Sequence, residues 1–171
     1  MSMILRQAAR SRMPVRSMGA GFSRLGGVRT IMEPTEIKYT ASAKASKGGR
    51  AGTVSVASAV APLSAPIPLA LPKSMGGTGE GVNPEQLFSA GYAACYLSAL
   101  HACARKAGKK IDGAEVEVKT SIGPTEEPGF ALVVEMLVKG VNDQSIVDAA
   151  HKMCPYSRAL KHGIKSTTKL V

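Results

Sequence analysis

One apolar helix of roughly 24 residues constrains this 171-residue chain more than any other segment. Asn83 is a good N-cap, Pro84 suits the first helical position, and Gln86 stands three residues after the cap, in capping-box spacing. Helix-compatible sequence continues to Ala107, after which Gly108 provides a C-terminal stop. At 1.5 Å per residue the predicted helix is roughly 36 Å long.

The first four turns of this helix have almost no polar face, because Leu, Phe, Ala, Tyr and Cys fill most positions from 87 to 100. A helix that is apolar on nearly every side belongs in a protein interior. One small domain can hardly cover such a helix alone, so we expect a partner subunit to contribute. No run of about 20 uninterrupted apolar residues occurs, and we therefore predict no transmembrane segment.

The rest of the chain has the patterns of strands, turns and short helices. Strands are predicted at 36–47, 53–59, 114–120, 130–139 and 164–171, with glycine turns at 47–52 and 123–129, an edge strand or extended loop at 61–72, a flexible loop at 73–82, a helix capped by residue 142 or 143 and ended by residue 155, and a short helix at 156–162. This order of strands, long helix, two strands, helices and strand indicates an α+β domain.

The net charge of +10 is concentrated at the N-terminus. Residues 1–32 contain six of the 22 basic residues, all of them arginine, and none of the 12 acidic residues. An Arg-rich, acid-free, Ser-containing segment predicts a mitochondrial transit peptide, followed by a near-neutral domain at 33–171. We expect a mitochondrial matrix location, or a cytoplasmic one if the extension is not functional.

The alternative for residues 1–32 is a basic arm that binds RNA or DNA. The remainder of the chain has few aromatic residues, little net charge and no RNA-binding motif. We therefore predict no nucleic-acid partner.

Three cysteines are candidates for chemistry, although each is also the size of an ordinary buried hydrophobic residue. Cys95 and Cys103 lie eight residues apart in one helix, a rise of about 12 Å, whereas a disulfide needs Cα atoms within about 7 Å. Any intrachain bridge must therefore join Cys154 to Cys95 or to Cys103. With no CxxC motif and no compact set of four ligands, we predict no metal site.

A reactive cysteine needs a cation or a helix end to stabilise its thiolate, and that cation needs an acceptor. Arg50 in the turn at 47–52 and Glu85 at the start of the long helix are candidates for these roles. Glu85 and Cys95 are ten residues apart, about 80° off one face and about 15 Å along the axis. They cannot touch unless the helix breaks near Gly91, but an arginine paired with Glu85 could bridge the gap.

Three motifs occur in order along the chain: GGR at 48–50, VNPEQLFSAGYAAC at 82–95 and DAAHKMCPYS at 148–157. Together they resemble the active-site motifs of the organic hydroperoxide resistance proteins, the Ohr subgroup of the OsmC/Ohr family. The similarity extends from about Ile37 to Val171. It implies the OsmC/Ohr-like α+β fold, with a long buried central helix packed on antiparallel sheets, in an intertwined homodimer.

The resemblance also implies a thiol-dependent peroxidase that reduces alkyl or lipid hydroperoxides to alcohols. Cys95 matches the peroxidatic nucleophile and Cys154 the resolving cysteine, with a disulfide between them. Arg50 matches the arginine that stabilises the thiolate and the peroxide. Glu85 matches the carboxylate that positions this arginine. Ala51 stands where the family usually has an acidic residue. The implied reductant is an external dithiol, dihydrolipoamide on lipoylated proteins, with no bound cofactor.

The apolar surroundings of Cys95 favour an alkyl or lipid tail as the substrate's organic group. Phe88, Tyr96 and Leu97 are candidates to line that substrate, with plain core packing as the alternative. Cys103 matches no catalytic position and is expected in the core. The competing hypothesis is a non-catalytic lipid-binding protein or redox sensor with the same fold.

Overall fold

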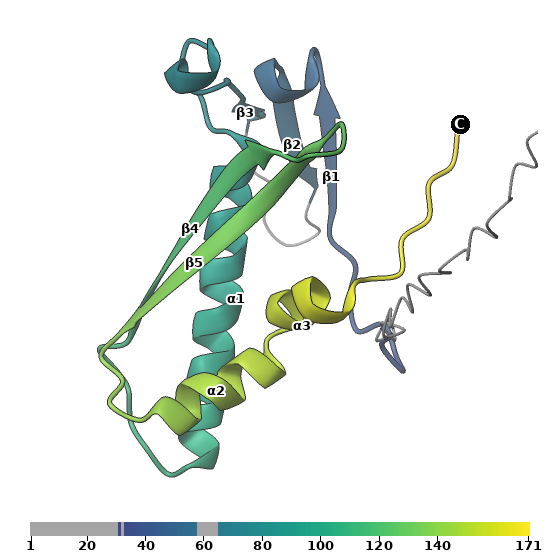
Figure 1. The fold of residues 1–171 in the computed structure, drawn as a ribbon. Coiled ribbons are helices and arrows are strands. Elements are labelled where there is room, and N and C mark those ends of the chain that lie inside the picture. Colours follow the sequence, from purple (N-terminus) through teal and green to yellow (C-terminus); the bar gives the residue numbers. More distant parts are fainter. Residues whose placement is uncertain (1–30, 32, 58–64) are drawn as a thin grey trace, which may run out of the picture.

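Helix α1 (Pro84–Lys106) runs unbroken for 23 residues, as the sequence predicts. The expected capping box closes its N-terminus: the side chain of Asn83 accepts the Gln86 N–H at 2.8 Å, and Gln86 Oε1 accepts the Asn83 N–H at 2.9 Å. The structure is a computed structural model that describes residues 31, 33–57 and 65–171, and the rest of the fold is built around this helix (Figure 1).

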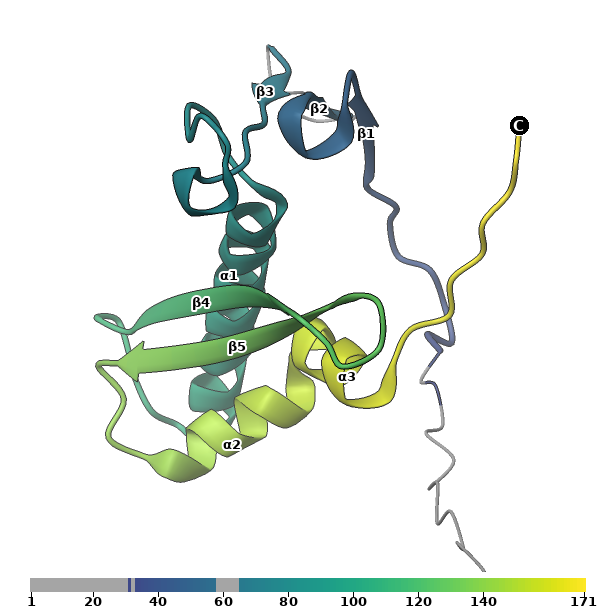
Figure 2. The same ribbon diagram turned by 45° about the horizontal axis from the view of Figure 1, so that its top comes forward.

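Two antiparallel sheets accompany α1, one at its N-terminal end and one along its side (Figures 1 and 2). The first contains β1 (Ser42–Ser46), β2 (Thr53–Ala57) and β3 (Ile67–Pro68), and the second is a hairpin of β4 (Glu115–Pro124) and β5 (Phe130–Lys139). Half-buried and exposed side chains alternate along β4, which packs against α1. The alternation predicted for this segment is therefore confirmed.

Helices α2 (Gln144–Met153) and α3 (Pro155–His162) also pack against α1. Asp143 caps α2 by accepting the Ser145 N–H at 2.9 Å, and it forms an ion pair with Lys109 just beyond the end of α1. The hydrogen bond from Lys109 is the main cause that lowers the pKa of Asp143 to about 2. This ion pair joins the end of α1 to the start of α2.

The core lies where α1 meets α2 and the β4–β5 hairpin. The buried positions on α1 recur every three or four residues: Tyr92, Tyr96, Ala99, Leu100, Cys103 and Ala104. Another face of the same helix is exposed at Ala90, Ala94 and Ser98. The chain thus covers only part of its apolar helix, and a second subunit that covers the rest stays a prediction.

The predicted strand at 36–47 is wrong in its first half, because only Ser42–Ser46 pairs with another strand. Ile37 and Tyr39 keep the alternating pattern of a strand, yet they are 67% and 80% exposed. No described strand lies beside them to accept their hydrogen bonds. β4, in contrast, is longer than the predicted strand at 114–120. It continues to Pro124, because β5 pairs with it that far.

The predicted strand at 164–171 is also wrong. The segment leaves α3 as an extended coil that points away from the body of the chain (Figure 1). Ile164 is 65% exposed, and Leu170 and Val171 are fully exposed. A strand pattern needs a neighbouring edge to pair with, and the described part of this chain offers none here.

Among the described residues, only α1 has the length and hydropathy of a membrane-spanning helix. Core helices of globular proteins have the same properties, so one such helix is weak evidence for a span. Here α1 packs against β4, α2 and α3, and we interpret it as a core helix. The predicted transit peptide at 1–32 lies, apart from Ile31, outside the described residues and stays a prediction.

Leu100→Ala should destabilise the protein by about 2–5 kcal/mol, because Leu100 is completely buried and truncating its side chain leaves a cavity in the core. Ser98→Ala, on the exposed face of the same helix, should change the free energy of unfolding by less than about 0.5 kcal/mol. Denaturant unfolding at one fixed protein concentration measures both. Equal effects from the two variants would contradict this assignment of the core.

Candidate active site

Cys95 on α1 and Cys154 between α2 and α3 lie side by side. Their Sγ atoms are 3.6 Å apart, and both are free thiols. Cys154 is fully buried, whereas Cys95 is half-buried. A disulfide of about 2.05 Å would need the sulfurs to approach by only about 1.5 Å. Of the two pairings that the spacing left open, the structure brings together Cys95 and Cys154.

Cys103 is separate from this pair. It is buried in the core, and its thiol faces the sulfur of Met153 at 3.8 Å. The prediction that Cys103 belongs to the core is confirmed.

The sequence Cys154-Pro155-Tyr156 determines what surrounds the Cys95 sulfur. Cys154 ends α2 and caps α3, and Pro155 occupies the first position of α3 without an N–H to donate. The next amide, that of Tyr156, has no partner within the helix and donates its hydrogen bond to Cys95. A helix N-terminus of this kind favours a thiolate.

Burial nevertheless raises the pKa of Cys95 above its ordinary value. The Tyr156 amide acts in the opposite direction, and the neighbouring Cys154 adds to the increase, first through its hydrogen bond with Cys95 and then through charge repulsion. Within one chain the Cys95 thiol is therefore mostly protonated at neutral pH. A further cation is needed to make it a good nucleophile.

Arg50 and Glu85 form the predicted ion pair. Arg50 Nη1 donates to the two carboxylate oxygens of Glu85 at 2.9 and 3.2 Å, and Nη2 also contacts Oε1. The glycine turn makes this possible: Gly48 and Gly49 have φ of 96° and 58°, which glycine adopts without strain, and the 3-10 turn Gly49–Ala51 follows. The turn thereby brings the guanidinium to the first turn of α1.

The ion pair and the cysteine pair occupy different places within one chain. Helix α1 continues through Gly91, so the ten residues from Glu85 to Cys95 span about 15 Å of its axis. Gly91 instead makes room for packing, since a Cβ there would come within 3.0 Å of the Tyr156 hydroxyl oxygen. The predicted site residues are therefore assembled in two halves.

An aromatic cluster adjoins the cysteine pair. Tyr92 stacks on Tyr156 with ring centroids 5.6 Å apart, and Phe88 lies 5.9 and 6.0 Å from the two rings. The Tyr92 hydroxyl is 2.8 Å from Ser157 Oγ, and burial raises the pKa of Tyr92. The sequence analysis missed Tyr92, Tyr156 and Ser157 as site residues, although all three belong to its motifs.

The three predicted substrate-lining residues have different surroundings. Phe88 is half-buried, and seven residues of helix place it about 20° from the direction of Cys95. Tyr96 is fully buried, its hydroxyl donates to the Val147 carbonyl at 2.8 Å, and burial raises its pKa to about 12. Leu97 lies about 160° around the helix from Cys95. Phe88 is the one of the three that shares the Cys95 face of α1, about 10 Å along the helix axis, and a substrate-lining role for all three stays a prediction.

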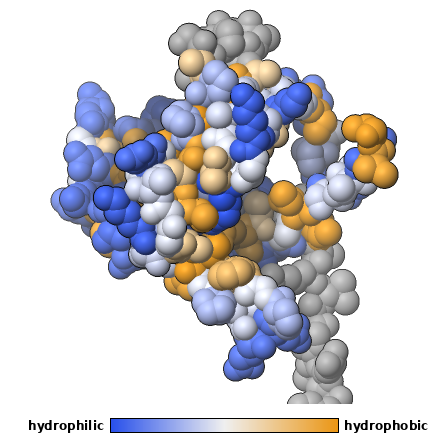
Figure 3. Space-filling view, turned by 90° about the horizontal axis from the view of Figure 1, so that it is seen from above, coloured by the Kyte–Doolittle hydropathy of each residue, from blue (hydrophilic) through white to orange (hydrophobic). Residues whose placement is uncertain are grey.

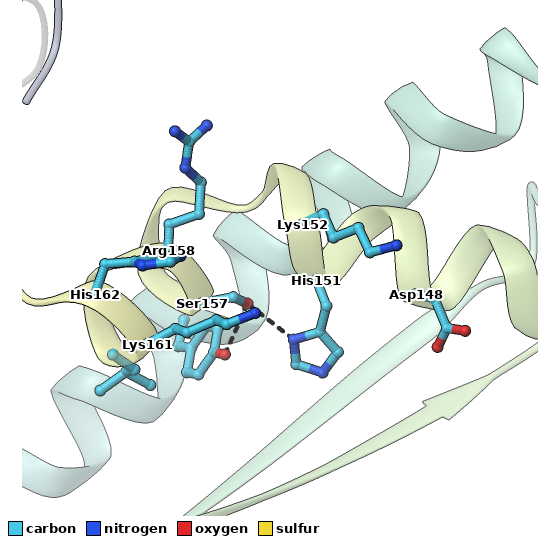
Figure 4. Close-up of a pocket in the computed structure, with 9 residues that line it drawn as sticks. Asp148, His151, Lys152, Ser157, Arg158, Lys161 and His162 are labelled. Carbon is cyan, nitrogen blue, oxygen red and sulfur yellow. Dashed lines mark hydrogen bonds between the residues drawn. The ribbon is translucent and has the colours of Figure 1, made fainter. Parts of the chain in front are cut away.

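A cavity of about 830 Å³ opens between α2 and α3 (Figure 4), and neither Cys95 nor Cys154 lines it. Tyr92 and Ser157 line it, and His151 Nδ1 lies 3.2 Å from Ser157 Oγ. Within the described ranges, no three His, Cys, Asp or Glu side chains gather to hold a metal ion.

Comparison with known proteins gives a consistent result. Residues 77–169 match the family of OsmC-like proteins. The chain is 42% identical over 147 residues to an organic hydroperoxide resistance protein of Xanthomonas axonopodis pv. citri, covering 82% of this chain and 99% of that one. It is 38% identical to the organic hydroperoxide resistance protein OhrB of Bacillus subtilis, over 69% and 88% of the two chains.

Solved structures agree with this result. An organic hydroperoxide resistance protein from Elizabethkingia anophelis superposes with a TM-score of 0.63 at 37% identity, over 76% of this chain and 94% of that one. The Bacillus subtilis OhrB structure gives 0.61 at 36% identity, over 74% and 93%.

The chain therefore belongs to the OsmC-like family, and its α+β fold, with a long central helix packed on antiparallel sheets, is the predicted one. Within that family it is an organic hydroperoxide resistance protein of the Ohr type.

Mild oxidation with diamide should link Cys95 to Cys154 and leave Cys103 free, because only the first two sulfurs lie within bonding reach after a small shift. Peptide mass mapping without reduction would identify the bridge. A Cys103→Ser variant should give the same cross-link in the same yield. A bridge that contains Cys103 would contradict the geometry.

Proposed function

We propose that the protein is a thiol-dependent peroxidase that reduces organic hydroperoxides to alcohols. The observation that carries this proposal is the 3.6 Å separation of a half-buried Cys95 and a fully buried Cys154, in a chain of the Ohr type. One sulfur is accessible to a peroxide, and the other is held where it can react with the first.

In the first step the Cys95 thiolate attacks the distal oxygen of the hydroperoxide. An S–O bond forms and the O–O bond breaks, so the sulfur loses two electrons and becomes a sulfenic acid. The alkoxide that leaves takes up a proton and departs as the alcohol. The Tyr156 amide, directed at the sulfur, favours the thiolate that begins this step.

In the second step Cys154 attacks the sulfenic sulfur. An S–S bond forms, the S–O bond breaks, and the hydroxide that leaves takes the Cys154 proton to become water. The short distance between the sulfurs favours this reaction over a second attack by peroxide, which would oxidise Cys95 irreversibly.

The structure separates Arg50 from Cys95, and we propose that a homodimer reunites them. Arg50 is bound to Glu85, about 15 Å of helix axis away from Cys95 of its own chain, so it would serve the Cys95 of the partner. There it would supply the cation that the buried thiol lacks and would also bind the peroxide oxygens. Glu85 would hold the guanidinium in position.

Exposed apolar surface supports this dimer. Large apolar side chains are exposed on β5 and in the C-terminal segment, including Phe130, Val133, Leu170 and Val171. Figure 3 shows apolar side chains in the middle of the face seen from above. Contiguous exposed apolar surface is typical of an interface, and a partner strand would give the 164–171 segment the pairing that it lacks.

The disulfide must be reopened by an external dithiol, and we propose dihydrolipoamide on lipoylated proteins. The family resemblance supports this reductant, and no bound cofactor enters the cycle. The Arg-rich segment at 1–32 supports a mitochondrial matrix location, where lipoylated proteins are abundant. Phe88, which shares the Cys95 face of α1, would contact the organic group of the substrate.

The second candidate is a redox sensor or lipid-binding protein with the same fold, because a reversible Cys95–Cys154 pair would serve a sensor equally well. Multiple turnovers distinguish the two functions. A peroxidase consumes many equivalents of hydroperoxide when a dithiol is present, whereas a sensor reacts once.

Cys95→Ser should reduce the turnover of cumene hydroperoxide with dihydrolipoamide by at least about a thousandfold, because serine cannot form the sulfenic acid. The assay is loss of peroxide in the presence of excess dithiol. Cys103→Ser, which alters only a core thiol, is the matched control and should retain near-normal turnover. Substantial activity in Cys95→Ser would refute the assignment of the nucleophile.

A further inference from the structure

The cavity between α2 and α3 carries an excess of positive charge. Its rim contains Lys152 from α2 and Arg158, Lys161 and His162 from α3, while Asp148 is the one acid that lines it (Figure 4). Within the described part of the chain, neither Lys152 nor Lys161 takes part in an ion pair. Two lysines at the rim of a hollow that form no ion pair attract an anionic group.

The lining of the cavity is polar as well as basic. The Tyr92 hydroxyl, Ser157 Oγ and His151 Nδ1 form a hydrogen-bonded chain along it, with distances of 2.8 and 3.2 Å. The apolar contribution comes from Leu160 and the Tyr92 ring. The larger part of the lining area is nonetheless apolar. A volume of about 830 Å³ with this lining suits a small amphipathic molecule, whose charged group would lie at the basic rim.

Neither cysteine lines the cavity, but each lies close in the chain to a residue that does. Tyr92 precedes Cys95 by three residues on α1, and His151 precedes Cys154 by three residues, so each sulfur lies about one helical turn from the lining. The Tyr92 ring also stacks on Tyr156, whose amide contacts the Cys95 sulfur. A molecule anchored in the cavity by one end could therefore present its other end to Cys95.

We propose that this cavity is a carboxylate-binding subsite, which gives the enzyme a preference for ligands that carry an acid group at a distance from the reacting atoms. The inference rests on the proposed peroxidase function. Either an acidic hydroperoxide or a free dithiol acid can supply the carboxylate, and Lys152 and Lys161 are the residues that bind it.

The test compares an acidic hydroperoxide with its neutral ester. Linoleic acid hydroperoxide and its methyl ester are assayed with dithiothreitol as the common reductant. In Lys152→Gln/Lys161→Gln, the ratio of kcat/KM for the acid to kcat/KM for the ester should fall about tenfold, mainly through KM of the acid. Added salt should raise KM for the acid in the wild type much more than in this variant.

Lys110→Gln/Lys139→Gln is the matched control, because it removes the same charge from lysines that do not line the cavity. Its acid-to-ester ratio should equal that of the wild type. An equal fall in both double variants would show a general charge effect and overturn the subsite. An unchanged ratio in Lys152→Gln/Lys161→Gln with every carboxylate tested would overturn it as well.

A second comparison identifies the source of the carboxylate. With cumene hydroperoxide as oxidant, dihydrolipoate is compared with its neutral amide. If Lys152→Gln/Lys161→Gln loses about tenfold in kcat/KM for dihydrolipoate but not for the amide, the result supports the subsite and assigns the carboxylate to the dithiol. A lipoylated protein is assayed as a third reductant. If the variant loses activity only with this protein, the proposal is overturned and the basic rim is a protein-docking surface.

A binding measurement separates failure of the subsite from failure of the proposed function. Decanoate should slow the alkylation of Cys95 by iodoacetamide in the wild type but not in Lys152→Gln/Lys161→Gln. This readout needs no peroxidase turnover. Alkylation that decanoate leaves unchanged in the wild type overturns the subsite, whereas absence of turnover with every hydroperoxide overturns the peroxidase.

Discussion

The fixed rise of helix α1 is the constraint on which the rest of the site depends. Glu85 in the first turn holds Arg50, while Cys95 three turns later faces Cys154. Because the helix is unbroken through Gly91, these two groups stay about 15 Å apart along its axis in every copy of the chain. In the proposed mechanism, the rigidity that places each pair accurately would also keep one chain from completing the site by itself.

Electrostatics gives a reason for the proposed meeting of the two halves in a dimer. Burial raises the pKa of Cys95, and the single amide of Tyr156 does not offset that cost. Arg50 carries a permanent charge that is already oriented by Glu85, so it can stabilise a thiolate without losing much further freedom. Bringing this ion pair to the thiol would favour the reactive form where the peroxide binds and nowhere else.

The local sequence was sufficient to predict elements whose determinants are local. The Asn83–Gln86 capping box defined the start of α1, and alternation defined the β4–β5 hairpin. The strands at 36–41 and 164–171 were mispredicted because alternation cannot show whether a partner edge is available. Motif resemblance identified both cysteines and implied their pairing, and the structure brings their sulfurs to 3.6 Å from each other.

The remaining site residues depend on tertiary packing. The Tyr156 amide is available to Cys95 because it lies in the first turn of α3, and Gly91 leaves space for the Tyr156 hydroxyl. The basic cavity arises where α2 and α3 meet, which no linear motif describes. Leu97 is different: its sequence position places it on the opposite side of the helix from Cys95, and its predicted contact with a substrate stays a prediction.

The most direct test of this account is the activity of a mixed dimer with one Arg50→Ala chain and one Cys95→Ser chain, purified through two different tags. If Arg50 acts across the interface, one of the two sites combines an intact Arg50 with an intact Cys95, and the mixed dimer should have about half of the wild-type turnover. Homodimers of either variant should be nearly inactive. A mixed dimer no more active than the Arg50→Ala homodimer would contradict the shared site.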